Sequence, residues 1–212
     1  MCGLIFAARP EVWPGVVAAN LARAGRNKGA FTYTKYVPGN TLTAVELLDT
    51  SRVVSGPDYA FKEAGITHLQ APTSAASRPH PAQAPKTLVW HNGLFQPAGM
   101  GIMQEMLHSK AEWDTELIAL AVAQGFDSMA FATLGVIPAS FACIAFHDGN
   151  LYAFRNSIAP LYVDEKRGDT LSSVKTGDVS LELTAGVVYW FREGVWQQSS
   201  FGFEVSHNPY GI

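Results

Sequence analysis

The chain has 212 residues, 48% of them hydrophobic and 16% charged, and 15 Lys and Arg against 18 Asp and Glu give a formal net charge of -3. A chain of this size and balance buries a sizeable core without disulfide or metal support. It has no block of like charges and no apolar stretch near the ~18 residues of a membrane span, so we expect neither nucleic acid nor a membrane as a partner. Its first residues lack the basic start of a secretion signal, and we expect a cytoplasmic protein.

The N-terminal half is predicted to alternate short strands with one helix. Strands are expected at residues 2–8, 31–36, 41–48 and 65–70, where the pattern is apolar or alternates with period two. A helix is expected at residues 11–25, with Pro14 in its first turn and Gly25 at its end. Residues 71–86 contain four prolines among Ser, Ala and Gln, which predicts a loop without regular structure that leaves and rejoins one sheet.

The C-terminal half begins with a predicted strand at residues 87–95 and helices at 101–108 and 114–124, the second with Asp114 as its N-cap. Two hairpins follow. Their strands are expected at residues 141–146 and 151–154 for the first, and at 187–191 and 195–198 for the second. Strands at both ends with helices between them predict a single α+β domain over residues 1–212, in which helices cover sheets.

Cys2 has the most distinctive chemistry in the chain, because a thiol directly after the initiator Met becomes amino-terminal once that Met is removed. An α-amine has a pKa of about 8 and a thiol one of about 8.5, so the amine can accept the thiol proton while the sulfur attacks a carbonyl. The nucleophile then carries its own base. The alternative is that Cys2 is a small apolar residue that merely opens a strand. The other cysteine, Cys143, is expected to be buried in a strand and inert.

Four sequence blocks occur in a characteristic order. They are MCGLIF at residues 1–6, GITHLQAPT at 65–73, VWHNGL at 89–94 and WDTE at 113–116. In order and approximate spacing, these blocks resemble class II glutamine amidotransferases, which belong to the N-terminal nucleophile hydrolases. Further similarity at residues 140–142, 154–156, 160–161 and 185–188 extends the resemblance over almost the whole chain. It implies a four-layer αββα sandwich of two mainly antiparallel sheets covered by helices.

The resemblance also implies roles for single residues. Cys2 would attack the carboxamide of glutamine and form a thioester, while the Asn92 side chain and the Gly93 backbone N–H would stabilise the oxyanion. Asp114 would pair with the substrate α-ammonium, and Thr73 would contact the ligand. Each has a plainer alternative: Asn-Gly is also a common hairpin turn, the Asp a helix cap, and a Thr in a proline-rich loop a partner for the backbone.

The main departure from the family pattern is at position 70, and residues 24–27, AGRN, only partly match an early Arg-Gly-x-Asp motif of the family. Where the family has an Arg that grips the substrate α-carboxylate, this chain has Gln70, which supplies hydrogen bonds but no charge. Either another cation reaches the pocket or the substrate is not free L-glutamine. The candidate cations are Arg26, Arg78, Lys86 and, if protonated, His68. We therefore expect weak glutaminase activity from the isolated chain.

The motifs present in the sequence also lead to expectations about partners and cofactors. No phosphate-binding loop occurs and the histidines show no metal-ligand spacing, so we expect neither a cofactor nor a metal. The resemblance implies that ammonia passes to an acceptor domain, for which 212 residues leave no room, and we expect a separate ATP-dependent synthetase or amidoligase subunit. Two alternatives are a hydrolase of the same architecture that cleaves a different amide, and a catalytically silent binding module.

Overall fold

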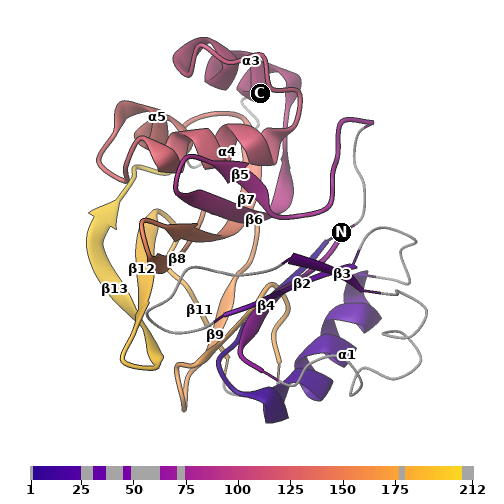
Figure 1. The fold of residues 1–212 in the computed structure, drawn as a ribbon. Helices are drawn as coiled ribbons and strands as arrows, with labels where there is room; N and C mark the ends of the chain where they lie inside the picture. The colour runs from indigo at the N-terminus through magenta and orange to yellow at the C-terminus, as the bar shows by residue number, and fades with distance from the viewer. Residues whose placement is uncertain are drawn as a thin grey trace.

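The structure, a computed structural model, describes residues 2–24, 31–36, 45–48, 63–70, 75–176 and 180–206. Two antiparallel sheets lie face to face. Helix α1 (Trp13–Ala24) covers the outer side of one, and α3 (Pro97–Met106), α4 (Asp114–Ala123) and α5 (Met129–Thr133) cover the outer side of the other (Figure 1). This order of layers confirms the predicted α+β class and the four-layer αββα sandwich. No helix in the described ranges is long and apolar enough to cross a membrane.

Within the described residues, the first sheet has seven strands in the order β11-β9-β10-β1-β4-β2-β3. Their bounds are β1 Gly3–Ala7, β2 Phe31–Lys35, β3 Val45–Leu48, β4 Gly65–Leu69, β9 Tyr162–Asp164, β10 Thr170–Ser172 and β11 Ser180–Glu182. Strand β1 lies inside the sheet and pairs antiparallel with β4, where Gly3 faces Leu69, and with β10, where Ile5 faces Ser172. The amino-terminal strand is therefore held along both of its edges.

The second sheet, over the same described ranges, has six strands in the order β13-β12-β8-β7-β6-β5. Their bounds are β5 Ala82–Ala84, β6 Thr87–Phe95, β7 Ala139–His147, β8 Asn150–Arg155, β12 Val187–Arg192 and β13 Val195–Gly202. The turns between β7 and β8 and between β12 and β13 have positive φ at Asp148, Gly149, Glu193 and Gly194. Both predicted hairpins are confirmed.

Three apolar layers follow from the alternation of side chains along the strands. Leu4 and Phe6 of β1 point between the sheets and pack there with Trp90 of β6. Ile5 and Ala7 point to the other side of β1, against α1. Helices α4 and α5 bury the third layer against the outer face of the second sheet. Along β1, β4 or β6, alternate residues therefore point to the same face, and the face of any residue can be inferred from a neighbour two positions away.

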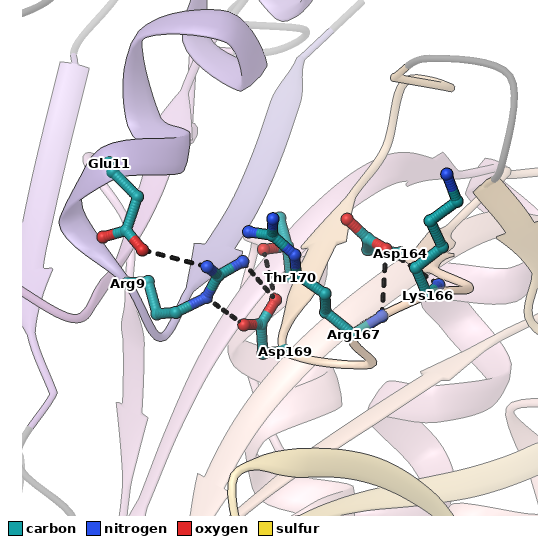
Figure 2. Close-up of polar contacts among 7 residues, drawn as sticks. All are labelled: Arg9, Glu11, Asp164, Lys166, Arg167, Asp169 and Thr170. Atoms are coloured by element: carbon teal, nitrogen blue, oxygen red, sulfur yellow. Dashed lines mark hydrogen bonds and ion pairs between the residues drawn. The ribbon is translucent and has the colours of Figure 1, made fainter.

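The end of β1 away from the N-terminus is closed by an ion pair. Arg9, which follows β1, contacts the carboxylate of Asp169, the residue before β10, and its Nη1 lies 2.9 Å from Oε1 of Glu11 (Figure 2). Asp169 Oδ1 also accepts a hydrogen bond from Thr170 Oγ1 at 3.1 Å. The Ala8 N–H donates to the Asp169 carbonyl oxygen at 3.1 Å. Strands β1 and β10 are thus joined at this end by backbone and side-chain contacts.

Several elements differ from the sequence prediction. The predicted loop at residues 71–86 contains β5, which forms because Ala82–Ala84 pairs with β6. Strands β9, β10 and β11 and helix α5 are absent from the prediction, and the predicted helix at 11–25 begins as a separate 3₁₀ helix, η1 (Pro10–Val12), before α1. Asp114 is the first residue of α4 and Trp113 is the N-cap, so the prediction that Asp114 caps this helix is wrong. Gly25 and residues 41–44 and 71–74 lie outside the described residues.

Candidate active site

Cys2 and Gln70 occupy neighbouring positions at the ends of two adjacent interior strands of the first sheet. Gly3 of β1 is paired with Leu69 of β4, so Cys2 and Gln70 are the next positions along these two strands. Cys2 lies two positions before Leu4, which points between the sheets, and Gln70 is the neighbour of Cys2 on β4, so both side chains are expected to point between the sheets as well. Cys2 is partly exposed, whereas Gln70 is buried. Figure 1 shows the N-terminus where the two sheets approach each other. The predicted nucleophile and the residue that replaces the family Arg therefore face the same space.

Asn92 reaches this space from the second sheet. It lies in β6 on the same face as Trp90, which packs between the sheets. His68 of β4 donates from Nε2 to the carbonyl oxygen of His91 at 2.9 Å, and this hydrogen bond between the sheets places Asn92 beside the end of β4. Asn92 is only 4% exposed, and no hydrogen bond joins its side-chain amide to another described residue. An amide that has no partner among the described residues is available to a ligand.

Gly93 has a backbone conformation that only glycine fits here. Its φ is 152°, and a Cβ would lie 1.8 Å from the carbonyl oxygen of Ser140. Gly93 is paired with Phe141 in the ladder between β6 and β7, so the alternative of a hairpin turn is wrong. Phe141 directs its N–H and C=O to Asn156, on the opposite side of β7 from β6. The Gly93 N–H therefore points away from β7, and the ladder does not use it.

Asp114 joins the start of α4 to the end of β6. Its Oδ2 accepts a hydrogen bond from the Phe95 N–H at 3.2 Å, and its Oδ1 accepts one from the Thr115 N–H at 2.8 Å. Burial raises the pKa of this carboxyl, but the His91 ring, whose Nδ1 is 3.7 Å away, and the backbone N–H donors of Phe95 and Thr115 outweigh burial and lower the pKa overall. Asp114 is therefore ionised at neutral pH, with 12% of its side chain exposed.

Three buried imidazoles connect α4 to both sheets. His91 Nδ1 and His80 Nε2 each lie 3.2 Å from the hydroxyl oxygen of Thr115. The rings of His80 and His68 stack with their centroids 3.7 Å apart. Burial lowers the pKa of His68 to about 3 and lowers that of His80 well below its ordinary value. Both rings are neutral at pH 7, so His68 does not supply the positive charge that was considered for it.

Solved structures identify the fold. Glutamine phosphoribosylpyrophosphate amidotransferase from B. subtilis matches with a TM-score of 0.65 over 94% of this chain, at 15% identity. A structure described as the allosteric regulatory enzyme of purine biosynthesis matches with a TM-score of 0.65 over 97% of this chain, at 13% identity. A glutamine aminotransferase class-II domain protein from Silicibacter pomeroyi matches with a TM-score of 0.56 over 95% of this chain and 100% of its own length, at 16% identity.

The chain has the fold of a class II glutamine amidotransferase domain. It spans about half the length of the first two proteins, 49% and 50%. No family model matches the sequence, and neither does any curated protein. The likeness is therefore one of fold, and it agrees with the order of blocks that the sequence shows.

Within this amidotransferase fold, two of the cations considered as partners for a substrate carboxylate have other surroundings. Lys86 pairs with Asp148, at the turn after β7, with Nζ and Oδ1 3.2 Å apart. Arg78 lines a cavity of about 600 Å³ beside Trp113. Two residues of the predicted site lie outside the described residues, namely Arg26 and Thr73. The described part of the chain holds no group of three or more His, Cys, Asp or Glu side chains arranged to bind a metal ion.

The sequence analysis missed the polar residues that pack against Gly3. Asn20 of α1 is fully buried, and a Cβ added to Gly3 would lie 3.1 Å from its Oδ1. Helix α1 therefore rests directly on the residue after Cys2. Asn20 also bonds Ser172 at the end of β10. The sequence signal for this contact is a polar residue on the apolar face of a predicted helix, four positions after Val16.

Proposed function

We propose that the chain is a glutamine amidotransferase-type amidohydrolase, which releases ammonia from L-glutamine or a related small amide through a thioester on Cys2. The proposal is supported by the placement of Cys2 and Asn92 on strands of different sheets, each at a position that faces between the sheets, and by the absence of a hydrogen bond from the Asn92 side-chain amide to any described residue. The proposal requires removal of Met1, so that Cys2 carries a free α-amine. We expect the reaction to occur in the cytoplasm.

The proposed reaction has two halves. Cys2 Sγ attacks the carboxamide carbon while its proton passes to the α-amine of the same residue. Asn92 Nδ2–H and the Gly93 N–H donate to the oxygen of the tetrahedral intermediate, and each such donor is worth about 3–4 kcal/mol. The C–N bond breaks, the α-ammonium returns its proton to the leaving nitrogen, and ammonia departs. Water then attacks the thioester with the α-amine as base, the C–S bond breaks, and the acid leaves with the thiol restored.

Substrate recognition is proposed to depend on Asp114, Gln70 and Thr73. Asp114 is ionised and suits the α-ammonium of an amino acid substrate. Gln70 lies next to Cys2 and offers an uncharged amide to the substrate α-carboxylate, while Thr73 supplies a hydroxyl contact. A neutral partner binds a carboxylate less tightly than a guanidinium does. Weak turnover of free L-glutamine by the isolated chain is therefore part of the proposal.

Gln70 also favours a second candidate, a hydrolase of the same architecture whose substrate is a different amide. Such a substrate would lack a free α-carboxylate and would lose nothing by the absence of a cation at this position. Ammonia release measured with glutamine, asparagine and acylated amino acid amides separates the two candidates. Faster turnover of an amide without an α-carboxylate would select the second.

We further propose a separate ATP-dependent synthetase or amidoligase subunit as the acceptor of the ammonia. The matched region makes up 49% of the amidotransferase from B. subtilis, so in that protein the same fold is joined to further chain. A docked subunit would receive ammonia before it is lost to water. Addition of the correct subunit with ATP is expected to raise amide turnover, and an unchanged rate would exclude that subunit as the partner.

Intact mass spectrometry after treatment with a glutamine-mimicking diazoketone tests the proposed function. We expect wild-type protein without Met1 to gain one equivalent on Cys2, and Cys2→Ala protein to gain none. Cys143 is the internal control, because it is fully buried and burial raises the pKa of its thiol. An unmodified Cys2, or Met1 still attached in the protein that turns over amide, would refute the mechanism and favour the silent binding module.

A further inference from the structure

A buried polar cluster holds the start of β1 from the side of α1. It consists of Asn20 in α1 and of Ser172 and Ser173 at the end of β10, and we call these three residues the Asn20 bracket. Their exposed fractions are 0%, 2% and 1%. Buried polar groups of this kind cost stability unless each of them is hydrogen-bonded. In the bracket these bonds are made, and they lead to the strand that follows Cys2.

The bonds of the bracket run from α1 to the backbone of β1. Asn20 Nδ2 donates to the Val16 carbonyl oxygen and to Ser172 Oγ, both at 2.9 Å, and Asn20 Oδ1 accepts from Ser173 Oγ at 3.2 Å. Ser173 Oγ in turn accepts the Leu4 N–H at 3.0 Å, and the Ser173 N–H donates to the Leu4 carbonyl oxygen at 2.8 Å. Ser173 therefore bonds both backbone groups of Leu4.

Ser172 provides a matched contrast, because it has similar surroundings without this contact. Its Oγ accepts hydrogen bonds from Asn20 Nδ2 and, at 3.1 Å, from the Val174 N–H. Over the described ranges, no hydrogen bond joins its hydroxyl to β1. The two adjacent serines are almost equally buried and both bond Asn20. The side-chain bond to Leu4 is therefore the difference between them that concerns β1.

The bracket acts next to the nucleophile. Leu4 is two residues after Cys2, and Gly3 packs so closely on the bracket that a Cβ would lie 3.1 Å from Asn20 Oδ1. Figure 2 shows the ion pair that holds the other end of β1 through the residue before β10. The residues on either side of β10 thus hold β1 at both of its ends.

We propose that Ser173 and Asn20 are positioning residues for Cys2. They fix the start of β1 so that Cys2 Sγ can attack the substrate carbonyl while the carbonyl oxygen accepts hydrogen bonds from Asn92 and Gly93 of β6. The inference rests on the proposed function, because it takes Cys2 as the nucleophile. Strand β10 ends at Ser172, so without the Ser173 hydroxyl the Leu4 N–H has no partner on that edge. A displacement of about 1 Å at a reacting group can cost on the order of 100-fold in rate.

The test compares Ser173→Ala with Ser172→Ala as the matched control and with Ser173→Thr, which keeps the hydroxyl. Cys2 in each protein is labelled with the glutamine-mimicking diazoketone, which requires an oriented thiol, and with iodoacetamide, which requires only an exposed thiolate. Intact mass spectrometry gives both rate constants. Hydrogen exchange reports the protection of the Leu4 amide. If Ser173→Ala does not fold, Ser173→Gly removes the same hydroxyl and takes its place.

In Ser173→Ala, we expect the ratio of the diazoketone to the iodoacetamide rate constant to fall about 10- to 100-fold, with faster exchange at Leu4. The ratio should be unchanged in Ser172→Ala and should return in Ser173→Thr. Equal effects of the two alanine variants, or lost protection of Leu4 with an unchanged ratio, would overturn the inference. If the diazoketone leaves wild-type Cys2 unmodified, the proposed function fails instead, and exchange at Leu4 still decides whether the bracket holds β1.

Discussion

Replacing Thr115 by Val removes one hydroxyl where α4 meets β6, with almost no change in side-chain volume. Thr115 is fully buried, and its oxygen lies 3.2 Å from both His80 Nε2 and His91 Nδ1 and 3.4 Å from Asp114 Oδ1. Val leaves two buried ring nitrogens without this partner, and each buried polar group left unpaired costs about 1–3 kcal/mol. Because relaxation recovers part of the sum, we expect the free energy of unfolding to fall by about 2–4 kcal/mol.

Urea unfolding followed by tryptophan fluorescence measures this loss, which corresponds to a decrease in Tm of roughly 4–16 °C for a chain of this length. The same change loosens Asp114, so we expect KM for the amide to rise more than kcat falls. Thr133→Val is the matched control, because that hydroxyl bonds only the Met129 carbonyl oxygen one turn back, at 2.8 Å. Thr115→Ser should restore most of the stability. Equal losses in Thr115→Val and Thr133→Val would refute the reasoning.

Three more perturbations address the site and its sensitivity to acid. Gly93→Ala places a methyl 1.8 Å from the carbonyl oxygen of Ser140, so we expect the free energy of unfolding to fall by about 1–3 kcal/mol and Cys2 not to be labelled by the diazoketone. Gly101→Ala is the control, because its methyl meets nothing within 4 Å and Cys2 should be labelled normally. Equal labelling of the two variants would contradict this prediction. Gln70→Arg should lower KM for L-glutamine about 10- to 100-fold, with the exposed Gln83→Arg as control, and an unchanged KM would show that position 70 does not face the substrate carboxylate. As pH falls from 6.5 toward 3, unfolded chains protonate His68 and folded chains do not, so the free energy of unfolding should fall by up to about 1.4 kcal/mol per pH unit. The lowered pKa of Asp114 adds a further loss below its ordinary range as the carboxylate protonates, and urea unfolding that is flat from pH 7 to 4 would contradict the assignment of a neutral buried His68.

The elements that sequence alone predicts well are those decided by neighbouring residues. Asp148 and Gly149 adopt positive φ in a hairpin turn, as their composition indicates. The Asn92-Gly93 dipeptide carries a similar local signal, yet both residues lie within β6, because pairing with β7 along the whole strand outweighs a two-residue preference. The strands β9, β10 and β11 have three residues each, too few for an alternating pattern to be recognised.

For the candidate site, too, some features could be predicted from the sequence and others depend on tertiary packing. The family resemblance singles out Cys2 and Asn92, but no periodicity or spacing could show that they lie on two sheets that face each other. The Asn20 bracket depends on a bond between residues 153 positions apart, and the contact of His80 with Thr115 spans 35 positions. Such contacts are set by tertiary packing. In the sequence they appear only as polar residues in apolar surroundings.

The proposed mechanism divides the reacting groups between two sheets, and it therefore makes the neutral state of His68 important for function. Its Nε2–H bonds the carbonyl oxygen of His91, directly before Asn92, so this hydrogen bond links the sheet of the proposed nucleophile to the sheet of the proposed oxyanion donor. Acid therefore acts on the site in two ways that can be separated. In the proposed mechanism, protonation of the Cys2 α-amine, near pH 8, removes the base and leaves the fold intact. Between about pH 6.5 and 3, by contrast, the unfolded chain binds a proton at His68 that the folded chain does not bind, and this lowers the free energy of unfolding. A rate that falls below pH 8 while the free energy of unfolding stays constant down to about pH 6.5 would identify the amine as the group that limits the reaction.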